Sequence, residues 1–392
     1  MKELRTRNDL ALYGAPPAFA ELLHVGRPNM GDENAFLERA RGIYASKWLT
    51  NNGPVVQELE ATVATMHDVQ HCVAMCNGTV ALEIAIRALG LSGEVIIPSY
   101  TFVATAHALY WQGITPVFAD IDPTTHNLDP DAVRALVTPR TTGIIGVHLW
   151  GRPAPVEALQ AIADDHGLQL MFDAAHAFAC SHGGQKIGCF GRCEVLSFHA
   201  TKVFNTFEGG AVLTNDDALA ERMRLMRNFG FAGFDNVVHP GTNGKMPEIC
   251  AAMGLVNIAA LPSFVESNRE RHRAYRRALE EVAGIRLLAY DEADEPNYQY
   301  VVIELERDFP ASRDEVIAAL QAENILARKY FWPGCHRMQP YRDIYPQASL
   351  HLGATEEVAA RVVVLPTGAT LPEAAVPTVG AVLSILGSTG GA

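Results

Sequence analysis

The sequence has little positive charge for its size. It contains 31 lysines and arginines against 44 aspartates and glutamates, which gives a formal net charge of −13 at pH 7. Binding to nucleic acid requires clustered lysine and arginine side chains that neutralise phosphates. The charge balance therefore argues against a nucleic-acid-binding protein.

Long apolar runs and paired cysteines are also scarce. We find no apolar run long enough to span a bilayer, and residues 1–9 are of mixed charge and lack the apolar core of a signal peptide. The seven cysteines are an odd number, scattered along the chain, and no two pairs have the spacing of a zinc site. We therefore expect a reduced, cytoplasmic protein without membrane contact and without a bound metal.

What the sequence does contain is a regular alternation of strand and helix patterns. Short runs rich in β-branched residues, bounded by Gly, Pro and Asp, alternate with segments of helical periodicity from residue 69 to residue 230. This pattern predicts an α/β fold with a mostly parallel sheet flanked by helices, and one of the last two strands running against the others. The predicted strands are 69–75, 94–98, 116–120, 143–149, 168–173, 195–199 and 210–214, and the predicted helices are 80–89, 104–112, 131–137, 156–166 and 217–227.

The pattern changes after residue 246. A long helical stretch rich in Glu and Arg runs to about residue 283, followed by predicted strands at 300–305 and 361–365 and helices at 312–323 and 373–386. With 392 residues the chain is long enough for two domains. We predict a large domain over residues 1–255 and a smaller α+β domain over 256–392, with a disordered Gly-rich tail from residue 387.

The stretch around Lys202 is the strongest chemical signal. Lys202 follows an apolar run that ends in Ser-Phe, and aromatic residues flank it. Such a lysine is poorly solvated and is driven towards the neutral amine, which a Schiff base with an aldehyde requires. Asp173 ends another apolar run and offers a carboxylate to a pyridinium nitrogen. Together they suggest a pyridoxal phosphate (PLP) enzyme.

Three further motifs occur in the order needed to surround one cofactor. Asn77-Gly78-Thr79 lies between a strand and a helix, where backbone N–H groups bind phosphate, although the same motif is typical of a simple turn and cap. The aromatic residues in 98–102 either stack on a flat ring or belong to the core. Ser197 either faces the phosphate or is an ordinary strand serine.

On these motifs the chain resembles the DegT/DnrJ/EryC1/StrS sugar aminotransferases, which are fold-type I PLP enzymes. The resemblance extends from Trp48 to the last helices. Its most specific segments are 77–79, 98–102, 172–176, 197–202, 208–210 and 241–246.

The resemblance implies a role for each matched residue. Lys202 carries the cofactor, Asp173 meets its pyridinium nitrogen, Phe102 stacks on the ring, His176 lies near the ring, Gly78, Thr79 and Ser197 hold the phosphate, and Asn243 reaches the phosphate of the neighbouring subunit's cofactor. A homodimer with shared sites follows, although a mobile loop is the alternative for residues 241–246.

The implied reaction has two halves. Glutamate gives its amino group to PLP, which becomes pyridoxamine phosphate, and a nucleotide-linked keto-sugar then takes the group, with Lys202 moving the proton. The wording of 172–176, 197–202 and Val147-His-Leu-Trp-Gly151 is most similar to members that aminate C4 of a dTDP-4-keto-6-deoxyhexose. Members that act at C3 more often carry Tyr-Pro-Gly-Lys at the lysine and Gln in place of His176.

Residues 328–336 are the candidate sugar-binding segment. Tyr330 and His336 carry polar tips on rings, and Arg328 and Lys329 are suited to face a diphosphate, although a packed loop is equally compatible with the sequence.

There are four alternatives to amination at C4, and the sequence leaves two of them open and argues against the other two. Amination at C3, or of a cyclitol or aminoshikimate-type ring, is compatible with the motifs. A sugar dehydratase of the same family typically has histidine in place of the lysine, so Lys202 argues against it. A PLP-binding regulator needs an output domain, for which the chain has no spare segment.

Overall fold

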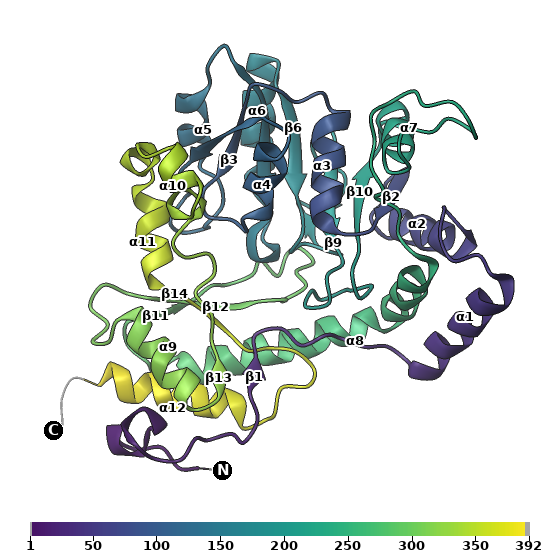
Figure 1. Ribbon diagram of the computed structural model, residues 1–392. Coiled ribbons are helices and arrows are strands. Elements are labelled where there is room, and N and C mark those ends of the chain that lie inside the picture. Colours follow the sequence, from purple (N-terminus) through teal and green to yellow (C-terminus); the bar gives the residue numbers. More distant parts are fainter. Residues whose placement is uncertain (1, 389–392) are drawn as a thin grey trace.

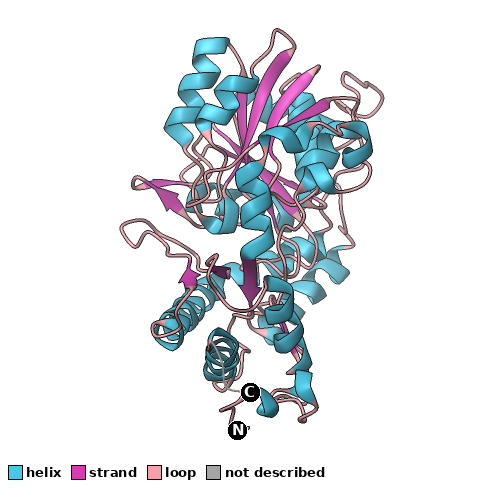
Figure 2. Ribbon diagram, turned by 90° about the vertical axis from the view of Figure 1, so that its left-hand side faces the viewer, coloured by secondary structure: helices cyan, strands magenta, loops and turns pink. Residues whose placement is uncertain are grey.

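The computed structural model describes residues 2–388. A seven-stranded sheet forms the centre of one unit, with helices on both faces (Figures 1 and 2). The strand order is β2-β10-β9-β6-β5-β3-β4, and β10 runs antiparallel to both neighbours. The predicted mostly parallel sheet with one reversed strand is confirmed. The strands are β2 (His71–Met75), β3 (Glu94–Pro98), β4 (Thr115–Ala119), β5 (Thr141–Val147), β6 (Gln169–Asp173), β9 (Glu194–Ser197) and β10 (Gly210–Thr214).

Burial and capping explain these elements. All residues of β3 and β10 are buried, as expected for strands covered on both faces. Side-chain caps begin the helices: Asn77 Oδ1 accepts from Val80 N at 2.8 Å, and Asp216 Oδ1 accepts from Leu219 N at 2.9 Å. The helices of this unit are α1 (Glu33–Ser46), α2 (Pro54–Met66), α3 (Gly78–Ala88), α4 (Ala104–Tyr110), α5 (Pro130–Leu136), α6 (Val156–His166) and α7 (Asp217–Met226), and a short hairpin joins β7 (Ser181–His182) to β8 (Gln185–Lys186).

Helix α8 (Glu248–Leu279) corrects one sequence-based statement. By length and composition, this helix is apolar enough to cross a membrane, whereas the sequence analysis predicts no such run. Of its most apolar window, 56% is buried, and the helix packs on α1, α2 and α12. The core helix of a globular domain meets the same criterion, so α8 is weak evidence for membrane contact.

The second unit is built on a three-stranded antiparallel sheet. Its strands are β11 (Ile285–Leu287), β12 (Val301–Leu305) and β14 (Val362–Leu365), and its helices are α9 (Arg313–Ala322), α11 (Gly353–Arg361) and α12 (Ala375–Gly387). The short helix α10 (Tyr341–Ile344) comes from the same part of the chain but packs on the core of the large sheet through Tyr341. The capping box of Ser312 and Glu315 begins α9. Of the tail predicted to be disordered, Gly387 ends α12, and residues 389–392 lie outside the described residues.

The N-terminal segment packs on this second unit, not on the large sheet. Leu10 and Leu23 belong to the apolar core formed by α9, α12 and β12, and β1 (Leu23–His24) pairs in parallel with β13 (Ile325–Leu326). The N-terminus accordingly lies near α9 and α12 in Figure 1. The division at residue 255 remains a prediction, and this packing adds residues of the N-terminal segment between Leu4 and Leu23 to the second core.

Candidate active site

The carboxyl ends of the parallel strands open onto a cavity of about 350 Å³. Nine of the twelve predicted site residues line it, and they come from five strand ends or turns that are far apart in the sequence. These nine are Gly78, Thr79, Phe102, Asp173, His176, Ser197, Lys202, Arg328 and Tyr330.

Lys202 lies in a turn beyond the end of β9, not at the strand end itself as its sequence context suggested. The turn is closed by the Lys202 backbone N–H, which donates to the carbonyl of His199 at 2.9 Å. Burial lowers the pKa of the Lys202 amine to about 8, and the negative charge of Asp173 opposes that shift. The Lys202 amine is therefore neutral in a substantial fraction of the molecules near physiological pH.

Asp173 is the last residue of β6, and two hydrogen bonds fix its carboxylate. Thr105 Oγ1 donates to Oδ2 at 2.8 Å, and the backbone N–H of Ala175 donates to Oδ1 at 3.1 Å. Burial raises the pKa of the Asp173 carboxyl, while these two donors and Lys202 oppose the rise. A cation bound opposite the carboxylate would hold it ionised.

His176 lies in the turn that follows β6, three residues after Asp173. The backbone N–H of Trp150 donates to its Nδ1 at 3.2 Å. Burial, reinforced by the charge of Lys202, lowers the pKa of His176 well below its usual range. A neutral imidazole that accepts at Nδ1 carries its proton on Nε2, so this side chain offers the cavity an N–H donor.

The start of α3 forms an anion cradle. The first N–H groups of a helix have no intrahelical partner, and the Asn77 side chain satisfies that of Val80, which leaves those of Gly78 and Thr79 for a ligand. A side chain at position 78 would lie 3.1 Å from Ser197 Cβ, and one at Gly210 would lie 2.7 Å from the Gly78 nitrogen. Glycine at both positions keeps the cradle open.

Phe102 stands at the edge of the cavity. Its ring meets Phe331 edge to face, with the centroids 6.3 Å apart, and the residue is 58% exposed. A ring face of this kind is available to a flat ligand.

Three predicted site residues lie outside the cavity. His336 is buried, where its ring bonds to Ser99 Oγ at 2.7 Å and to Glu356 at 3.1 Å. Lys329 pairs with Asp314 at 2.8 Å and lines an adjacent groove. Asn243 is exposed in the loop before α8, where it pairs with Asn228.

The sequence analysis missed several residues that support the site. Thr105 holds Asp173, and His199, which lines the cavity, pairs with Glu208 at 2.7 Å. The motif of residues 208–210 pointed to Glu208 without suggesting its partner. Nothing in the sequence distinguishes Thr105 from other helical threonines.

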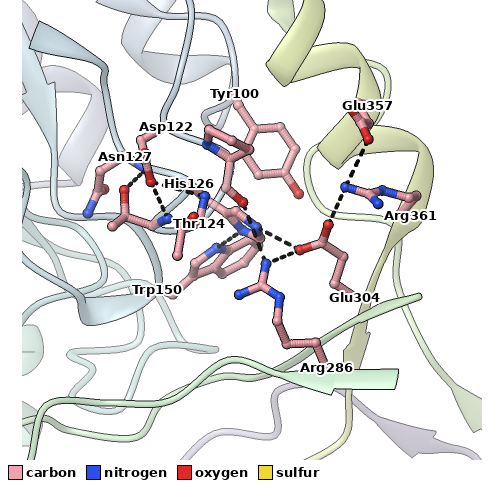
Figure 3. A network of polar contacts seen from close by, with 12 residues as sticks. Tyr100, Asp122, Thr124, His126, Asn127, Trp150, Arg286, Glu304, Glu357 and Arg361 are labelled. Carbon is pink, nitrogen blue, oxygen red and sulfur yellow. Dashed lines mark hydrogen bonds and ion pairs between the residues drawn. The ribbon is translucent and has the colours of Figure 1, made fainter. Parts of the chain in front are cut away.

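A buried network supports Trp150 from behind (Figure 3). The indole N–H donates to His126 Nδ1 at 3.3 Å, and His126 Nε2 meets Glu304 at 3.4 Å. Glu304, on β12, also pairs with Arg286 and with Arg361, the latter at 2.6 Å. The second unit therefore helps to hold the residue that orients His176.

Comparison with known proteins places this geometry in a family. A model of the DegT/DnrJ/EryC1/StrS aminotransferase family matches residues 31–384. Curated relatives include a dTDP-4-amino-4,6-dideoxy-D-glucose transaminase of Shigella dysenteriae, 38% identical over 89% of this chain and 95% of the relative. A GDP-perosamine synthase of Caulobacter vibrioides is 34% identical over 86% and 91%.

The solved structures agree with the family match. The structure of DesI in the presence of its TDP-sugar product is 48% identical, covers 96% of both chains and superposes with a TM-score of 0.92. The structure of DesV in complex with a ketimine intermediate is 30% identical, covers 93% of this chain and has a TM-score of 0.84. The predicted fold type I and the predicted cofactor, PLP, are confirmed. This chain belongs to the DegT/DnrJ/EryC1/StrS family and is a PLP-dependent aminotransferase.

Proposed function

We propose that this enzyme transfers an amino group to C4 of a nucleotide-linked 4-keto-6-deoxyhexose, with dTDP as the nucleotide. One observation carries the proposed amine transfer: buried Lys202, whose amine is partly neutral, lines the same cavity as Asp173 and His176. The names of the dTDP-4-amino-4,6-dideoxy-D-glucose transaminases and of the DesI structure, which holds a TDP-sugar product, support the substrate class.

The residues present fit PLP. The open cradle at Gly78, Thr79 and Ser197 suits its phosphate, since a Cβ at position 78 would fill that space. Asp173 suits the pyridinium nitrogen, and Phe102 offers a face to the ring. When bound, PLP supplies an aldehyde that links to an amine and a ring that withdraws electrons from it.

The protein's own residues then position and move protons. Lys202, whose amine is partly neutral and which lines the cavity, would remove a proton from the amine-bearing carbon in one half of the reaction and return a proton in the other half. His176 lines the cavity and offers its Nε2–H as a donor to a bound ligand. The negative charge of buried Asp173 would stabilise the protonated ring nitrogen of bound PLP.

A panel of substrates tests the proposed reaction. The enzyme is incubated with glutamate and, in turn, with dTDP-4-keto-6-deoxyglucose, its GDP-linked mannose counterpart, a 3-keto isomer and a keto-cyclitol. We expect amine transfer to the first substrate, with the amine at C4 by NMR. Preferred amination of the GDP-sugar, of C3 or of the cyclitol would contradict the respective part of the proposal, as would a deoxy-sugar formed without amine transfer.

We also propose a homodimer in which each subunit completes its partner's site. Large apolar side chains are exposed on α1, just after it and in the loop after α7. Helix α1 and this loop both lie on the right-hand side of the ribbon in Figure 1. They include Tyr44 (85% exposed), Trp48 (50%), Phe229 (46%) and Phe234 (98%). Large exposed apolar side chains are suited to burial against a partner, and Asn243 lies towards the end of the loop that carries Phe229 and Phe234. The cytoplasm is the proposed location, in keeping with seven free cysteines.

Mixed dimers provide a test of shared sites. Lys202→Ala and Asn243→Ala are each expected to be poorly active alone. Mixing them gives dimers in which one site has both native residues, so up to about half of the sites in each heterodimer regain activity. Exchange is followed by two different affinity tags. Demonstrated exchange without any recovery would contradict the assignment of Asn243 to the partner's site.

A further inference from the structure

A second, smaller cavity adjoins the one around Lys202. It measures about 150 Å³ and shares Thr201, Tyr300, Arg328 and Tyr330 with the larger cavity. Gln299 also lines it, and the N-terminal segment at residues 24–26 forms its outer wall. Within the described part of the chain, no aspartate or glutamate lines this cavity, which we call the Arg328 pocket.

Two donors at this pocket lack partners. Arg328 lies with its guanidinium 5.0 Å from the ring centre of Tyr330 and makes no ion pair with any carboxylate in residues 2–388. Gln299 is only 6% exposed; its Oε1 accepts from Val203 N at 3.1 Å, and its Nε2 has no hydrogen-bond partner within bonding distance among the described residues. The Gln299 side chain does lie near enough to the Tyr300 hydroxyl to oppose the rise that burial causes in the pKa of Tyr300. An unsatisfied buried N–H is costly, so a site that leaves one beside a free guanidinium is suited to an anion.

The neighbouring cations are already paired. Lys329 meets Asp314, and Arg313 bonds to the carbonyl of Ala359 and to Asp314. Arg328 is therefore the cation at this end of the cavity that is left for a ligand. Its planar fork matches the two oxygens of a carboxylate.

The size of the pocket limits what it can hold. At about 150 Å³ it is smaller than the roughly 300–1,000 Å³ of sites that enclose drug-sized ligands, so a nucleoside diphosphate does not fit within it. A single carboxylate with a short methylene stem does. The amino donor of the proposed reaction is an amino acid, which must reach Lys202 with its amine.

We propose that the Arg328 pocket binds the distal carboxylate of a dicarboxylic amino donor, with Arg328 as the anchor and Gln299 as a second donor. This inference rests on the proposed function, whose amino donor is glutamate, and assigns the residues that recognise that donor. Glutamate and aspartate are the common dicarboxylic amino acids.

The linings of the two cavities favour the distal carboxylate over the α-carboxylate. Arg328 lines both cavities, whereas Gln299 lines only the second one. A carboxylate held by both side chains therefore lies beyond the cavity of Lys202. The α-carboxylate is bonded to the carbon that carries the amine and stays beside Lys202, so a donor needs a second, more distant carboxylate to reach both side chains.

The test measures the donor half of the reaction alone. Purified holoenzyme is mixed with glutamate or with alanine, and the absorbance change of the cofactor is followed by stopped flow in wild type, Arg328→Met and Gln299→Glu. We expect the second-order rate constant for glutamate to fall about 10–100-fold, the loss expected for a hydrogen-bonded charge pair. For alanine, which lacks the distal carboxylate, we expect a change of less than about twofold.

Gln299→Glu is informative because it nearly preserves shape. The variant keeps an oxygen for the Val203 N–H but replaces the free N–H₂ by a negative charge, so glutamate is repelled and alanine is not. Arg342→Met, at an exposed arginine, is the matched control and should leave both donors unchanged. Arg328→Lys keeps the positive charge but removes the planar guanidinium, so the second-order rate constant for glutamate should fall by less than in Arg328→Met.

A binding measurement separates recognition from turnover. We expect calorimetry to show that Arg328→Met raises the dissociation constant of glutarate at least about tenfold and leaves that of butyrate unchanged. Circular dichroism and thermal melting confirm that the variants fold.

The outcomes distinguish the pocket from the function. If Arg328→Met lowers the rate constants for glutamate and for alanine equally, the proposal is overturned in favour of a site for the α-carboxylate. A loss confined to the reverse half-reaction with the amino-sugar would overturn it in favour of a sugar or phosphate contact. If wild type accepts an amino group from no amino acid, the proposed function fails, and not merely the assignment of the pocket.

Discussion

Replacing Lys202 by alanine should reduce amine transfer by about 10⁴-fold, the upper range for a positioned general acid–base. The same change should remove the covalent, borohydride-reducible link between protein and PLP. The reason is that Lys202 is the lysine that lines the cavity, and burial makes its amine part-neutral. The measurement combines steady-state kinetics with peptide mass spectrometry after reduction. Lys186→Ala, which alters a surface ion pair with Glu295, is the control and should retain both properties. Reduced PLP found on another lysine of the Lys202 variant would refute the assignment.

The pH dependence of cofactor capture gives an independent check on Lys202. The neutral amine attacks an aldehyde, and it predominates above the amine's pKa, which burial places at about 8. The rate at which apoenzyme captures PLP should therefore rise about tenfold per pH unit below pH 7 and level off above about pH 8. A lysine with its ordinary pKa would keep gaining rate up to about pH 10.4. Absorbance after stopped-flow mixing reports this rate.

Replacing Asp173 by asparagine should lower kcat/KM by about 10²–10³-fold while PLP stays attached to Lys202. The amide keeps nearly the same shape but removes the charge opposite the cofactor's ring nitrogen, and fixed charges of this kind are worth about that much. Kinetics give the loss, and mass spectrometry after borohydride reduction shows that the link is intact.

Thr105→Val tests the orientation of the same carboxylate and should have a smaller effect than Asp173→Asn. It leaves the Asp173 charge in place but removes the 2.8 Å hydrogen bond that orients it, so a loss of about tenfold is expected. Activity of Asp173→Asn within tenfold of wild type, or a larger loss in Thr105→Val than in Asp173→Asn, would contradict the role given to the carboxylate.

Local patterns predicted the large sheet well because each of its strands is a short apolar run between breakers. The run that ends at Asp173 and the turn-and-cap motif at Asn77–Thr79 both identified positions that the fold brings to one sheet edge. Parallel α/β topology makes that convergence general, since strand ends meet on the same side. The reversed strand β10 was anticipated but could not be assigned from its own residues.

The sequence was less informative where packing over long separations decides the outcome. His336 has the composition of a binding residue, yet it lies buried between Ser99 and Glu356, which are 237 and 20 residues away. The N-terminal segment has weak patterns of its own and takes its place by pairing β1 with β13. Helix α8 is apolar over a membrane-like length because it packs on three other helices.

The sequence by itself determined the class of chemistry. Lys202, Asp173 and the cradle at Gly78 are each defined by residue type and by a neighbouring breaker or cap, and such local features are encoded within a few residues. Only the tertiary structure decided which charges are left unpaired. Lys329 is tied to Asp314, while the adjacent Arg328 is free beside Gln299, and nothing local separates the two cations. The physical reason is that ion pairing and burial depend on partners far along the chain, and these partners determine which side chains remain available to a ligand.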